Sequence, residues 1–340
     1  PQQRHRETGV RVGRERQVAL AMDRDLVVDL DLFGRQLRGQ PREQRLVFAG
    51  HGHACLHQRD PLHQHREFGQ RRFERDVGLE HRIGLRDQRD APPHELLVVD
   101  DRSTDETRAV AARHGVRVVP ARAPGGLNAG RNTGIAATTA PVIAFVDDDV
   151  WAPPTWLAAL HAGAERHPDA GALGGPIRAR LLGPAPRSCG REPAPITTLD
   201  LGPGDRDAER IWGANLTVRR GAVEAVGEFD ESLPIYGDEE EWQARLLASG
   251  GRIAYVADAW LEHRRMGPDS RLRALARAEY RRGRAARRDD RRKGSELPLG
   301  SELRNIAGAG WHTVRRRCPQ GLIMGAHSTG RLVEALRGGR

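Results

Sequence analysis

Asp147, Asp148 and Asp149 stand in a row directly after a short apolar run, residues 142–146. The run has the length and the flanks of a buried strand, and open α/β sheets bind their ligands at the carboxyl ends of such strands. Like charges repel, so a fold that gathers three carboxylates there is expected to hold a cation. Carboxylate oxygens are preferred ligands of Mg²⁺ and Mn²⁺, which often bridge to substrate phosphates. The triplet therefore indicates a divalent-metal site, with a solvated acidic turn before Pro153 as the alternative.

A second acidic pair, Asp100 and Asp101, ends another predicted buried strand, residues 95–99. Ser103, followed three residues later by Glu106, has the spacing of a capping box and predicts that a helix starts there. This helix and the apolar run after it complete a βαβ unit, whose strands are parallel and joined by a right-handed crossover. Two successive strands thus end in acidic residues at the same edge of one sheet. That coincidence favours a ligand site over a solvated turn.

The elements that position these acids alternate between helix and strand. In chain order we expect a glycine-rich loop over residues 124–130, a helix from Arg131, an amphipathic helix over 156–167, a long mobile loop over 183–210, a strand over 212–218, helices over 221–226 and 238–250, and a strand over 253–256. The helix from residue 238 opens with four carboxylates, which the helix dipole alone can explain. Beyond residue 271 the chain predicts an arginine-dense helix, followed by a basic tail that carries an apolar patch at residues 321–324.

Composition narrows the class of protein. A chain of 340 residues can bury one large core or two modest ones, and its net charge of +9 comes almost entirely from arginine, with Lys293 the single lysine. Such a bias is typical of GC-rich coding sequence, and no aromatic residues alternate with the arginines, so no nucleic-acid partner is expected. Cys55, Cys189 and Cys318 lie far apart and lack metal-ligand spacing, which fits a reducing compartment without a disulfide framework. Without an apolar span or leader in the sequence as given, we expect a cytoplasmic protein.

The first part of the chain differs in amino-acid composition from the rest. Residues 1–93 hold ten of the twelve glutamines and half of the histidines, whereas all six tryptophans lie beyond residue 150. The histidines between residues 51 and 65 could form a metal tract, but no spacing repeats. We therefore interpret the start of the chain, residues 1–85, as disordered or frame-shifted, and the arginine-dense end, residues 266–340, as a basic helical extension.

Five motifs in order resemble the inverting family 2 glycosyltransferases of the GT-A type, over about residues 86–265. They are ELLVVDDRSTDET, GGLNAGRNTGIAAT, VIAFVDDDV, WGANLTVRRGAVEAVGEFDE, and GDEEEWQARLLASGG with a later histidine. The resemblance implies a GT-A fold with a nucleotide-binding, mostly parallel sheet flanked by helices, followed here by the helical C-terminal extension. It also implies an enzyme of glycoconjugate or cell-envelope biosynthesis that uses a nucleotide-diphosphate sugar.

The resemblance assigns the donor end of the site. Asp100 and Asp101 match the acidic pair that receives the base and ribose of the donor, and Arg131 matches a basic residue near its phosphates. Asp147 and Asp149 match the ends of the DXD motif, which holds the metal that bridges the diphosphate. Asp149 is the expected direct ligand of Mg²⁺ or Mn²⁺, and Asp147 is expected to contact ribose, metal-bound water or the metal itself.

The resemblance also assigns the catalytic end. Inversion requires one general base that deprotonates the acceptor hydroxyl, and the family takes it from an acidic pair at a helix start. Here that pair is Asp238 and Glu239, with the usual order of the acids swapped, so Glu239 is the expected base and Asp238 the runner-up. His263 matches a late histidine near the metal or diphosphate, with a structural role as the alternative. Asn215, in a segment that lines the acceptor side, is a further candidate binding residue.

One departure concerns the family's first strand, of the type VSVVIPTYNR, because nothing in residues 55–90 resembles it. We therefore expect a central strand to be missing, through a frameshift or a mis-assigned start. The leading function is a metal-dependent, inverting glycosyltransferase. The alternatives are a catalytically impaired GT-A remnant, a nucleotidyltransferase, for which no glycine-rich basic signature is visible, and an arginine-rich nucleic-acid binder.

The acceptor stays open between a glycan, a lipid and a small molecule. The basic, partly apolar tail allows two interpretations. It could rest on an anionic membrane as a peripheral contact, which would place the site at the inner face beside a lipid-linked acceptor. It could equally be ordinary helix packing.

Overall fold

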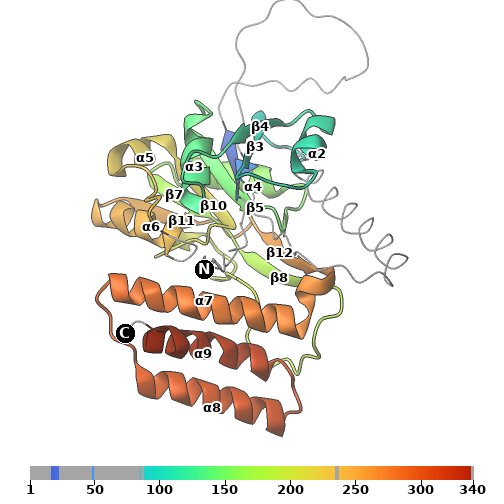
Figure 1. Ribbon diagram of the computed structural model, residues 1–340. Coiled ribbons are helices and arrows are strands. Elements are labelled where there is room, and N and C mark those ends of the chain that lie inside the picture. The colour runs from blue at the N-terminus through green and yellow to red at the C-terminus, as the bar shows by residue number, and fades with distance from the viewer. Residues whose placement is uncertain (1–16, 23–47, 50–84, 86–87, 234–236, 338–340) are drawn as a thin grey trace, which may run out of the picture.

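The computed structural model describes residues 17–22, 48–49, 85, 88–233 and 237–337, arranged as an α/β layer above a layer of three long helices (Figure 1). Most of residues 1–85 lie outside the described residues, as do the histidines between residues 51 and 65, so the predictions of disorder, of a frameshift and of a metal tract stay predictions.

Within the described residues, the large sheet has nine strands in the order β2-β3-β1-β5-β10-β7-β11-β9, with β4 also paired to β3. Their bounds are β1(Gln17–Met22), β2(Phe48–Ala49), β3(His94–Asp100), β4(Arg117–Pro120), β5(Val142–Asp147), β7(Ala170–Gly174), β9(Arg206–Asp207), β10(Asn215–Arg219) and β11(Arg252–Tyr255). The predicted α/β class is confirmed, but the mostly parallel pairing is wrong, because β1 and β10 run antiparallel to both of their neighbours. A loop after β9 leads into β10, in place of the crossover helix that joins parallel neighbouring strands.

The central position of the sheet is occupied. β1 lies between β3 and β5 and is antiparallel to both, with Ala19 opposite Leu97 on one side and Phe145 on the other. The prediction that a central strand is missing is therefore wrong for the backbone. An amino-terminal segment unlike the family's first strand provides the hydrogen-bonding partner that β3 and β5 share.

Helices cover both faces of the sheet, and β5 is buried on both sides. The helices of this layer are α2(Thr107–Arg113), α3(Leu127–Ala136), α4(Trp156–Arg166), α5(Arg220–Val226) and α6(Asp238–Ala248). Successive strand residues point to opposite faces. Accordingly, Ala144 joins a core that contains Trp156 of α4, while Phe145 joins a second core that contains Trp242 of α6. A strand buried on both faces explains why residues 142–146 form a continuous apolar run.

A small second sheet crosses the end of β5. It consists of β6(Val150–Trp151), β12(Leu261–Met266) and β8(Ile177–Leu182), in the order β6-β12-β8. The β6–β12 pairing places His263 opposite Val150, next to the aspartate triplet. The register of this short ladder therefore brings a histidine distant in sequence to the carboxylates at the end of β5.

The C-terminal extension is helical, as predicted. A 3₁₀ turn, η2(Gly267–Ser270), leads into α7(Leu272–Arg292), α8(Leu299–Arg315) and α9(Gly321–Arg337). α9 lies between α7 and α8 (Figure 1). α7 and α9 approach closely, since a Cβ at Gly283 would overlap the carbonyl of His327 and one at Gly330 would overlap the carbonyl of Tyr280. Among the described helices, none is both long and apolar enough to cross a membrane.

The long segment after β8 joins the two layers. Most of residues 183–210 lack regular structure, as expected for a loop, yet the segment is not free on the surface. Ile196 is buried in a small core together with Leu275 of α7 and Ile323 of α9. The predicted mobile loop is therefore anchored to the helical layer at this point.

Candidate active site

The predicted metal ligands come together. Asp147 ends β5, Asp149 lies in the turn to β6, and His263 is on β12; one ligand atom from each lies within 4.8 Å of the others. His263 Nε2 is 3.1 Å from Asp149 Oδ1. The backbone N–H of Arg264 also donates to the carbonyl of Asp149, at 2.8 Å, which fixes the turn against β12. Two carboxylates and one imidazole form a donor set that fits Mg²⁺ or Mn²⁺.

The hydrogen bonds of His263 orient its ring. Nδ1 lies 3.3 Å from the carbonyl oxygen of Thr197, which can only accept, so a proton on Nδ1 would be bonded there and would leave the Nε2 lone pair for a metal ion. Burial lowers the pKa of His263, although the nearby charge of Asp147 opposes that shift. A neutral imidazole whose free nitrogen faces a carboxylate is the form that binds metal ions.

A cation of the chain itself already contacts these groups. The Arg265 guanidinium forms an ion pair with Asp149, and its Nη1 is 3.2 Å from His263 Nε2. Arg265 lies two residues after His263 on the same strand, so both side chains project from one face. A divalent ion that binds Asp149 and His263 therefore competes with this guanidinium.

The predicted general-base pair is held by a buried arginine. Arg131 Nη1 lies 2.6 Å from Asp238 Oδ2, and Arg131 Nη2 lies 3.7 Å from Glu239 Oε2. Asn128 accepts a second bond from Arg131 Nη1, at 2.6 Å. Gly213 donates its backbone N–H to Glu239 Oε1 at 3.0 Å, and a Cβ at Gly213 would overlap the guanidinium. The structure thus places Arg131 against the acidic pair; its predicted contact with donor phosphates stays a prediction.

Asp238 and Glu239 both contact Arg131, but their pKa values shift in opposite directions. Burial and the adjacent Glu239 charge raise the pKa of Asp238 well above its ordinary range. Burial acts on Glu239 in the same direction, but Arg131 and the hydrogen bonds from Asp238 and Gly213 outweigh it and lower the pKa of Glu239. Glu239 is also the less buried of the two, with 12% of its side chain exposed against 4% for Asp238. Glu239 is therefore the ionised, accessible member of the pair.

Asp147 of the metal-ligand cluster interacts electrostatically with Glu239 of the acidic pair. Burial raises the pKa of Asp147, and the charges of Arg131 and Arg265 oppose the increase, whereas Glu239 adds to it. Interactions of this kind require proximity, because they weaken with distance. The carboxylates at the end of β5 and at the start of α6 are therefore close enough to influence each other's ionisation.

Asp100 and Asp101 have local partners at the end of β3. The Asp100 carboxylate accepts from the Ser103 backbone N–H at 3.0 Å and from Arg108 Nε at 2.6 Å, and these bonds lower its pKa despite burial. Asp101 accepts from the backbone N–H of Gly126 at 2.9 Å and so ties the glycine-rich loop to the sheet edge. Their predicted contacts with base and ribose stay predictions.

The helix after β3 starts later than expected. α2 begins at Thr107, whose N–H donates to Asp105 at 3.0 Å, and Glu106 occupies the N-cap position without a side-chain bond. The predicted capping box is wrong, because the Ser103 hydroxyl bonds to Asp100 instead of capping a helix.

Asn215 lies in the interior. Its Oδ1 accepts from Trp156 Nε1 at 3.1 Å, and its Nδ2 donates to the carbonyls of Ala259 at 2.8 Å and Pro176 at 3.4 Å. Both amide hydrogens are therefore used within the core. These contacts describe a residue that holds β10 against its neighbours, and they do not support the predicted binding role.

The family model for glycosyl transferase family 2 matches residues 83–226. The N-acetylglucosaminyl-diphospho-decaprenol L-rhamnosyltransferase of Mycobacterium tuberculosis is 30% identical over 236 residues, which cover 55% of this chain and 74% of that protein. The chain belongs to glycosyl transferase family 2. This membership, with the observed α/β sheet and helical C-terminal layer, confirms the predicted GT-A fold class.

A second relative matches a smaller part of the chain. The pre-mycofactocin glycosyltransferase of Mycobacterium tuberculosis is 30% identical over 179 residues, 49% of this chain and 37% of that protein, so the chain spans well under half of its length. Among solved structures, the mannosyltransferase PcManGT from Pyrobaculum calidifontis in complex with GDP-Man and Mn²⁺ has a TM-score of 0.44 and 16% identity, covering 76% of this chain and 66% of that chain.

The sequence did not predict the contacts that two residues of this family 2 chain make. Asn128 is three residues before Arg131 on α3 and holds its guanidinium, a spacing at which helical side chains meet. Arg265 is two residues after His263, a spacing at which strand side chains share a face. Both spacings were visible in the sequence, but neither could be interpreted before the partner from a distant element was known.

Proposed function

We propose that this chain is a metal-dependent glycosyltransferase that transfers a sugar from a nucleotide-diphosphate donor to an acceptor hydroxyl with inversion. The observation that carries the proposal is the arrangement at the edge of the sheet. There, the Asp147, Asp149 and His263 cluster lies within electrostatic reach of Glu239, an ionised carboxylate. Family membership favours this function over the nucleotidyltransferase alternative.

The donor end is supplied by the carboxylates after β3 and β5. Asp149 and His263 would hold Mg²⁺ or Mn²⁺, together with Asp147. When bound, such an ion neutralises the charge that develops on the departing nucleoside diphosphate. Arg265 would exchange its carboxylate partner for a donor phosphate, because a guanidinium pairs equally well with phosphate oxygens.

The catalytic end is Glu239. As an ionised carboxylate it accepts the proton of the acceptor hydroxyl while that oxygen attacks the anomeric carbon. The Gly213 N–H holds Glu239 Oε1, and Arg131 lies 3.7 Å from Oε2, so the base is oriented before the acceptor arrives. Asp238, bonded to Arg131 and with a raised pKa, is better placed to position the pair than to act as the base.

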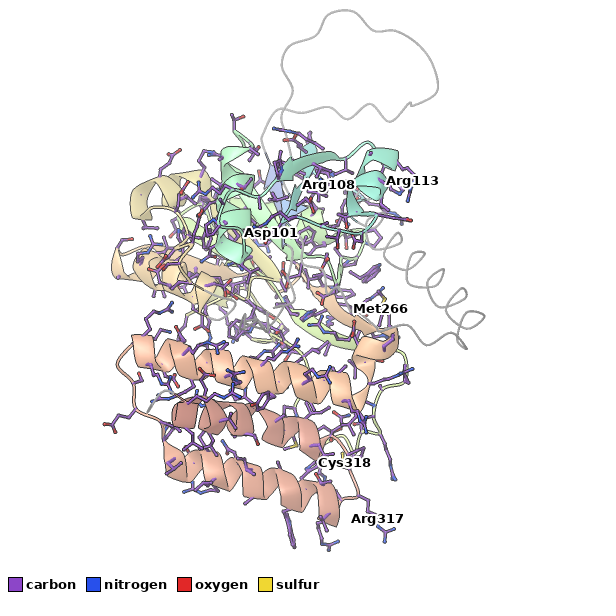
Figure 2. The ribbon with its side chains drawn as sticks, in the orientation of Figure 1. Asp101, Arg108, Arg113, Met266, Arg317 and Cys318 are labelled. Atoms are coloured by element: carbon purple, nitrogen blue, oxygen red, sulfur yellow. The ribbon has the colours of Figure 1, made fainter. Side chains whose placement is uncertain are left out.

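For the acceptor we propose a lipid-linked sugar at an anionic membrane surface. The relative with 74% coverage is named for rhamnosyl transfer to N-acetylglucosaminyl-diphospho-decaprenol. α8 exposes a stripe of large apolar side chains at helical spacing, and arginines follow it. Their exposures are 55% for Leu299, 54% for Leu303, 68% for Trp311 and 77% for Val314. Figure 2 shows Arg317 on the outer side of the helical layer, away from the sheet. A face of this type suits the boundary between headgroups and acyl chains.

A donor panel tests the proposed activity. UDP-, GDP- and dTDP-sugars are incubated with the chain, with and without Mn²⁺, and the released nucleoside diphosphate is measured. We expect one nucleotide class to be turned over, only with the metal, and not by Asp149→Asn. No turnover and no nucleotide binding across the panel would leave the impaired remnant as the better description.

Vesicle co-sedimentation tests the membrane proposal separately. We expect the chain to sediment with vesicles that contain phosphatidylglycerol and not with pure phosphatidylcholine, and Trp311→Ser to weaken the binding. Equal sedimentation of the wild type and Trp311→Ser would contradict a role for α8.

A further inference from the structure

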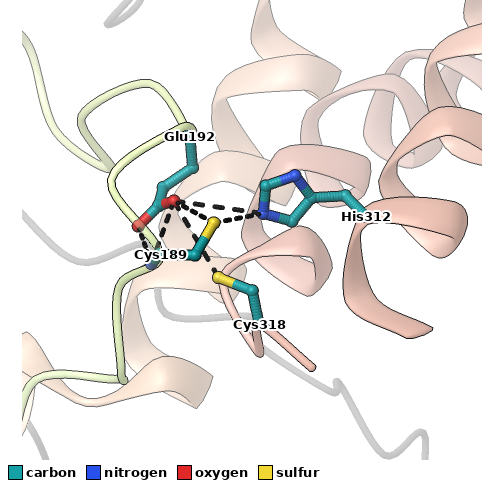
Figure 3. A group of neighbouring side chains, drawn as sticks. All are labelled: Cys189, Glu192, His312 and Cys318. Atoms are coloured by element: carbon teal, nitrogen blue, oxygen red, sulfur yellow. Dashed lines mark hydrogen bonds and ion pairs between the residues drawn. The ribbon is translucent and has the colours of Figure 1, made fainter. Parts of the chain in front are cut away.

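Four side chains with metal-binding atoms converge far from the sheet edge. Cys189 and Glu192 come from the segment after β8, His312 lies near the end of α8, and Cys318 lies in the turn between α8 and α9. Figure 3 shows the four side chains pointing toward one another, and one ligand atom from each lies within 4.8 Å of the others. The cluster has no part in the proposed sugar transfer.

The separations between these atoms match those of a tetrahedral site. The Cys189 Sγ lies 3.1 Å from Glu192 Oε2 and 3.4 Å from His312 Nε2. Glu192 Oε2 is also 3.9 Å from both Cys318 Sγ and His312 Nε2. Zinc bonds of about 2.3 Å to sulfur and 2.0–2.1 Å to nitrogen or oxygen place tetrahedral ligand atoms roughly 3.3–3.8 Å apart. Small side-chain adjustments would bring all four atoms to a common centre.

We propose that Cys189, Glu192, His312 and Cys318 bind one zinc ion as a closed, structural site. Two sulfurs and one imidazole nitrogen are a soft donor set, which selects Zn²⁺ over the Mg²⁺ or Mn²⁺ preferred by carboxylate clusters. Binding converts both thiols to thiolates and releases their two protons to solvent, with no change of oxidation state. Four protein ligands leave no coordination position for a substrate, as in structural sites.

The backbone around Glu192 is shaped to present its carboxylate. The N–H groups of Cys189 and Arg191 donate to it at 3.2 Å and 3.1 Å, and Gly190 makes the turn between them with a φ of 75°, which suits glycine. The described residues give this carboxylate one ion-pair partner, His312, at 3.9 Å. A carboxylate that faces two thiols and an imidazole, held by neutral donors, is a place where a divalent cation is favoured.

Two other uses of the cluster fit less well. A nucleophilic cysteine would need its thiolate stabilised, but the Glu192 carboxylate lies 3.1 Å from the Cys189 sulfur and opposes deprotonation. A disulfide between Cys189 and Cys318 would leave His312 and Glu192 without a role in the cluster. Zinc uses all four side chains.

The site would fix the segment after β8 to the helical layer. From Glu192 the chain continues to Ile196, buried against α7 and α9, and to Thr197, whose carbonyl oxygen is 3.3 Å from His263 Nδ1. A zinc ion would therefore restrain the start of a segment whose other end, at Thr197, orients a candidate ligand of the catalytic metal. The zinc ion would therefore affect activity only indirectly, by helping to position His263.

Cobalt substitution tests the site, because thiolate ligands give Co²⁺ a charge-transfer band that oxygen ligands do not give. We expect the refolded or chelator-treated chain to bind one Co²⁺ with that band, and one equivalent of Zn²⁺ to remove it. Cys189→Ser and Glu192→Gln should weaken or abolish the band. Asp149→Asn, which disables the carboxylate cluster, and Cys55→Ser, which removes a thiol outside the four, should both keep it. A band of undiminished intensity and affinity in Cys189→Ser would overturn the proposal.

Native mass spectrometry supplies a second readout if Cys318→Ser, at a buried position, fails to fold. The wild type purified with reductant should carry the mass of one zinc ion less two protons, and Cys189→Ser, at an exposed position, should lack it. A metal-free chain that is two hydrogens lighter, with a Cys189–Cys318 disulfide, would overturn the proposal. These outcomes do not depend on whether the chain transfers sugar.

Discussion

The two ligand clusters of this chain each gather one buried histidine with anionic partners, yet they differ in nearly every other respect. The Asp147, Asp149 and His263 cluster lies at the edge of the sheet, beside the cation of Arg265 and within reach of Glu239. The cluster of Cys189, Glu192, His312 and Cys318 lies between a loop and the helical layer, where backbone N–H groups hold the carboxylate.

The difference separates a site that can take part in a reaction from one that can only hold a structure. Three ligands leave coordination positions open for phosphate oxygens, whereas four ligands close a tetrahedral ion. Carboxylates select hard cations, and thiolates select zinc. Changes in the first cluster should therefore alter rates, and changes in the second should alter stability.

The largest expected effect is that of Asp149→Asn. We expect kcat/KM for donor turnover to fall about a thousandfold, because the ion that neutralises the leaving diphosphate loses a ligand. The midpoint of thermal unfolding should change little. Asp148→Asn, the neighbouring aspartate outside the cluster, is the matched control and should cost less than about tenfold. Equal losses of kcat/KM in Asp149→Asn and Asp148→Asn would contradict the assignment of Asp149 as a metal ligand.

Glu239→Gln should come next, with a loss of about a hundredfold in transfer, because the amide cannot accept the acceptor proton. Donor binding, measured by calorimetry with the nucleoside diphosphate and Mn²⁺, should stay within about threefold of wild type. Glu241→Gln, two residues along α6 and paired with Arg245, is the control. A parallel loss of donor binding and transfer would argue against Glu239 as the base.

The pH dependence of transfer gives an independent check on Glu239. Because Arg131 and hydrogen bonds lower its pKa, the carboxylate is already ionised near neutral pH and loses its charge only below the ordinary glutamate value. We therefore expect kcat/KM to be flat on the acidic side between about pH 8 and 6. An acidic limb with a midpoint inside that window would point to a different base.

Cys189→Ser should lower the midpoint of thermal unfolding by roughly 5 °C or more, while kcat changes less than about threefold. A zinc chelator should produce the same shift in the wild type and none in the variant. Cys55→Ser serves as control. A loss of activity as large as that of Asp149→Asn, with an unchanged midpoint, would reverse the assignment of the two clusters.

The smallest effect concerns Arg265. Replacing it with methionine removes a cation that contacts both Asp149 and His263, so Mn²⁺ should bind several-fold more tightly in the absence of donor. Arg264→Met, at the next position and paired with Glu262, should leave Mn²⁺ affinity unchanged. Weaker Mn²⁺ binding by Arg265→Met would show that the guanidinium supports the ion rather than competing with it.

The parts of the site that sequence patterns could predict are those on regular elements. The run before Asp147 and the acids that open α6 carry strand and helix signals, and their positions in the structure agree with those signals. The mostly parallel pairing and the start of α2 were predicted wrongly. A Ser103–Asp100 hydrogen bond replaces the expected helix cap, and β10 follows a loop and not a crossover helix.

The cysteine cluster escaped prediction for a different reason. Cys189 and His312 are 123 positions apart, and the expectation of no metal spacing considered cysteines alone. Only the packing of the segment after β8 against α8 and α9 brings them together. The short spacing from Cys189 to Glu192 was visible, but a single pair of that kind carries no prediction.

Anomalous diffraction at the manganese and zinc absorption edges, from one crystal grown with both metals and a nucleoside diphosphate, tests the contrast between the two clusters most directly. We predict a manganese peak among Asp147, Asp149 and His263, next to the diphosphate, and a zinc peak among Cys189, Glu192, His312 and Cys318. A diphosphate bound without metal at the sheet edge, or manganese in the cysteine cluster, would contradict the account.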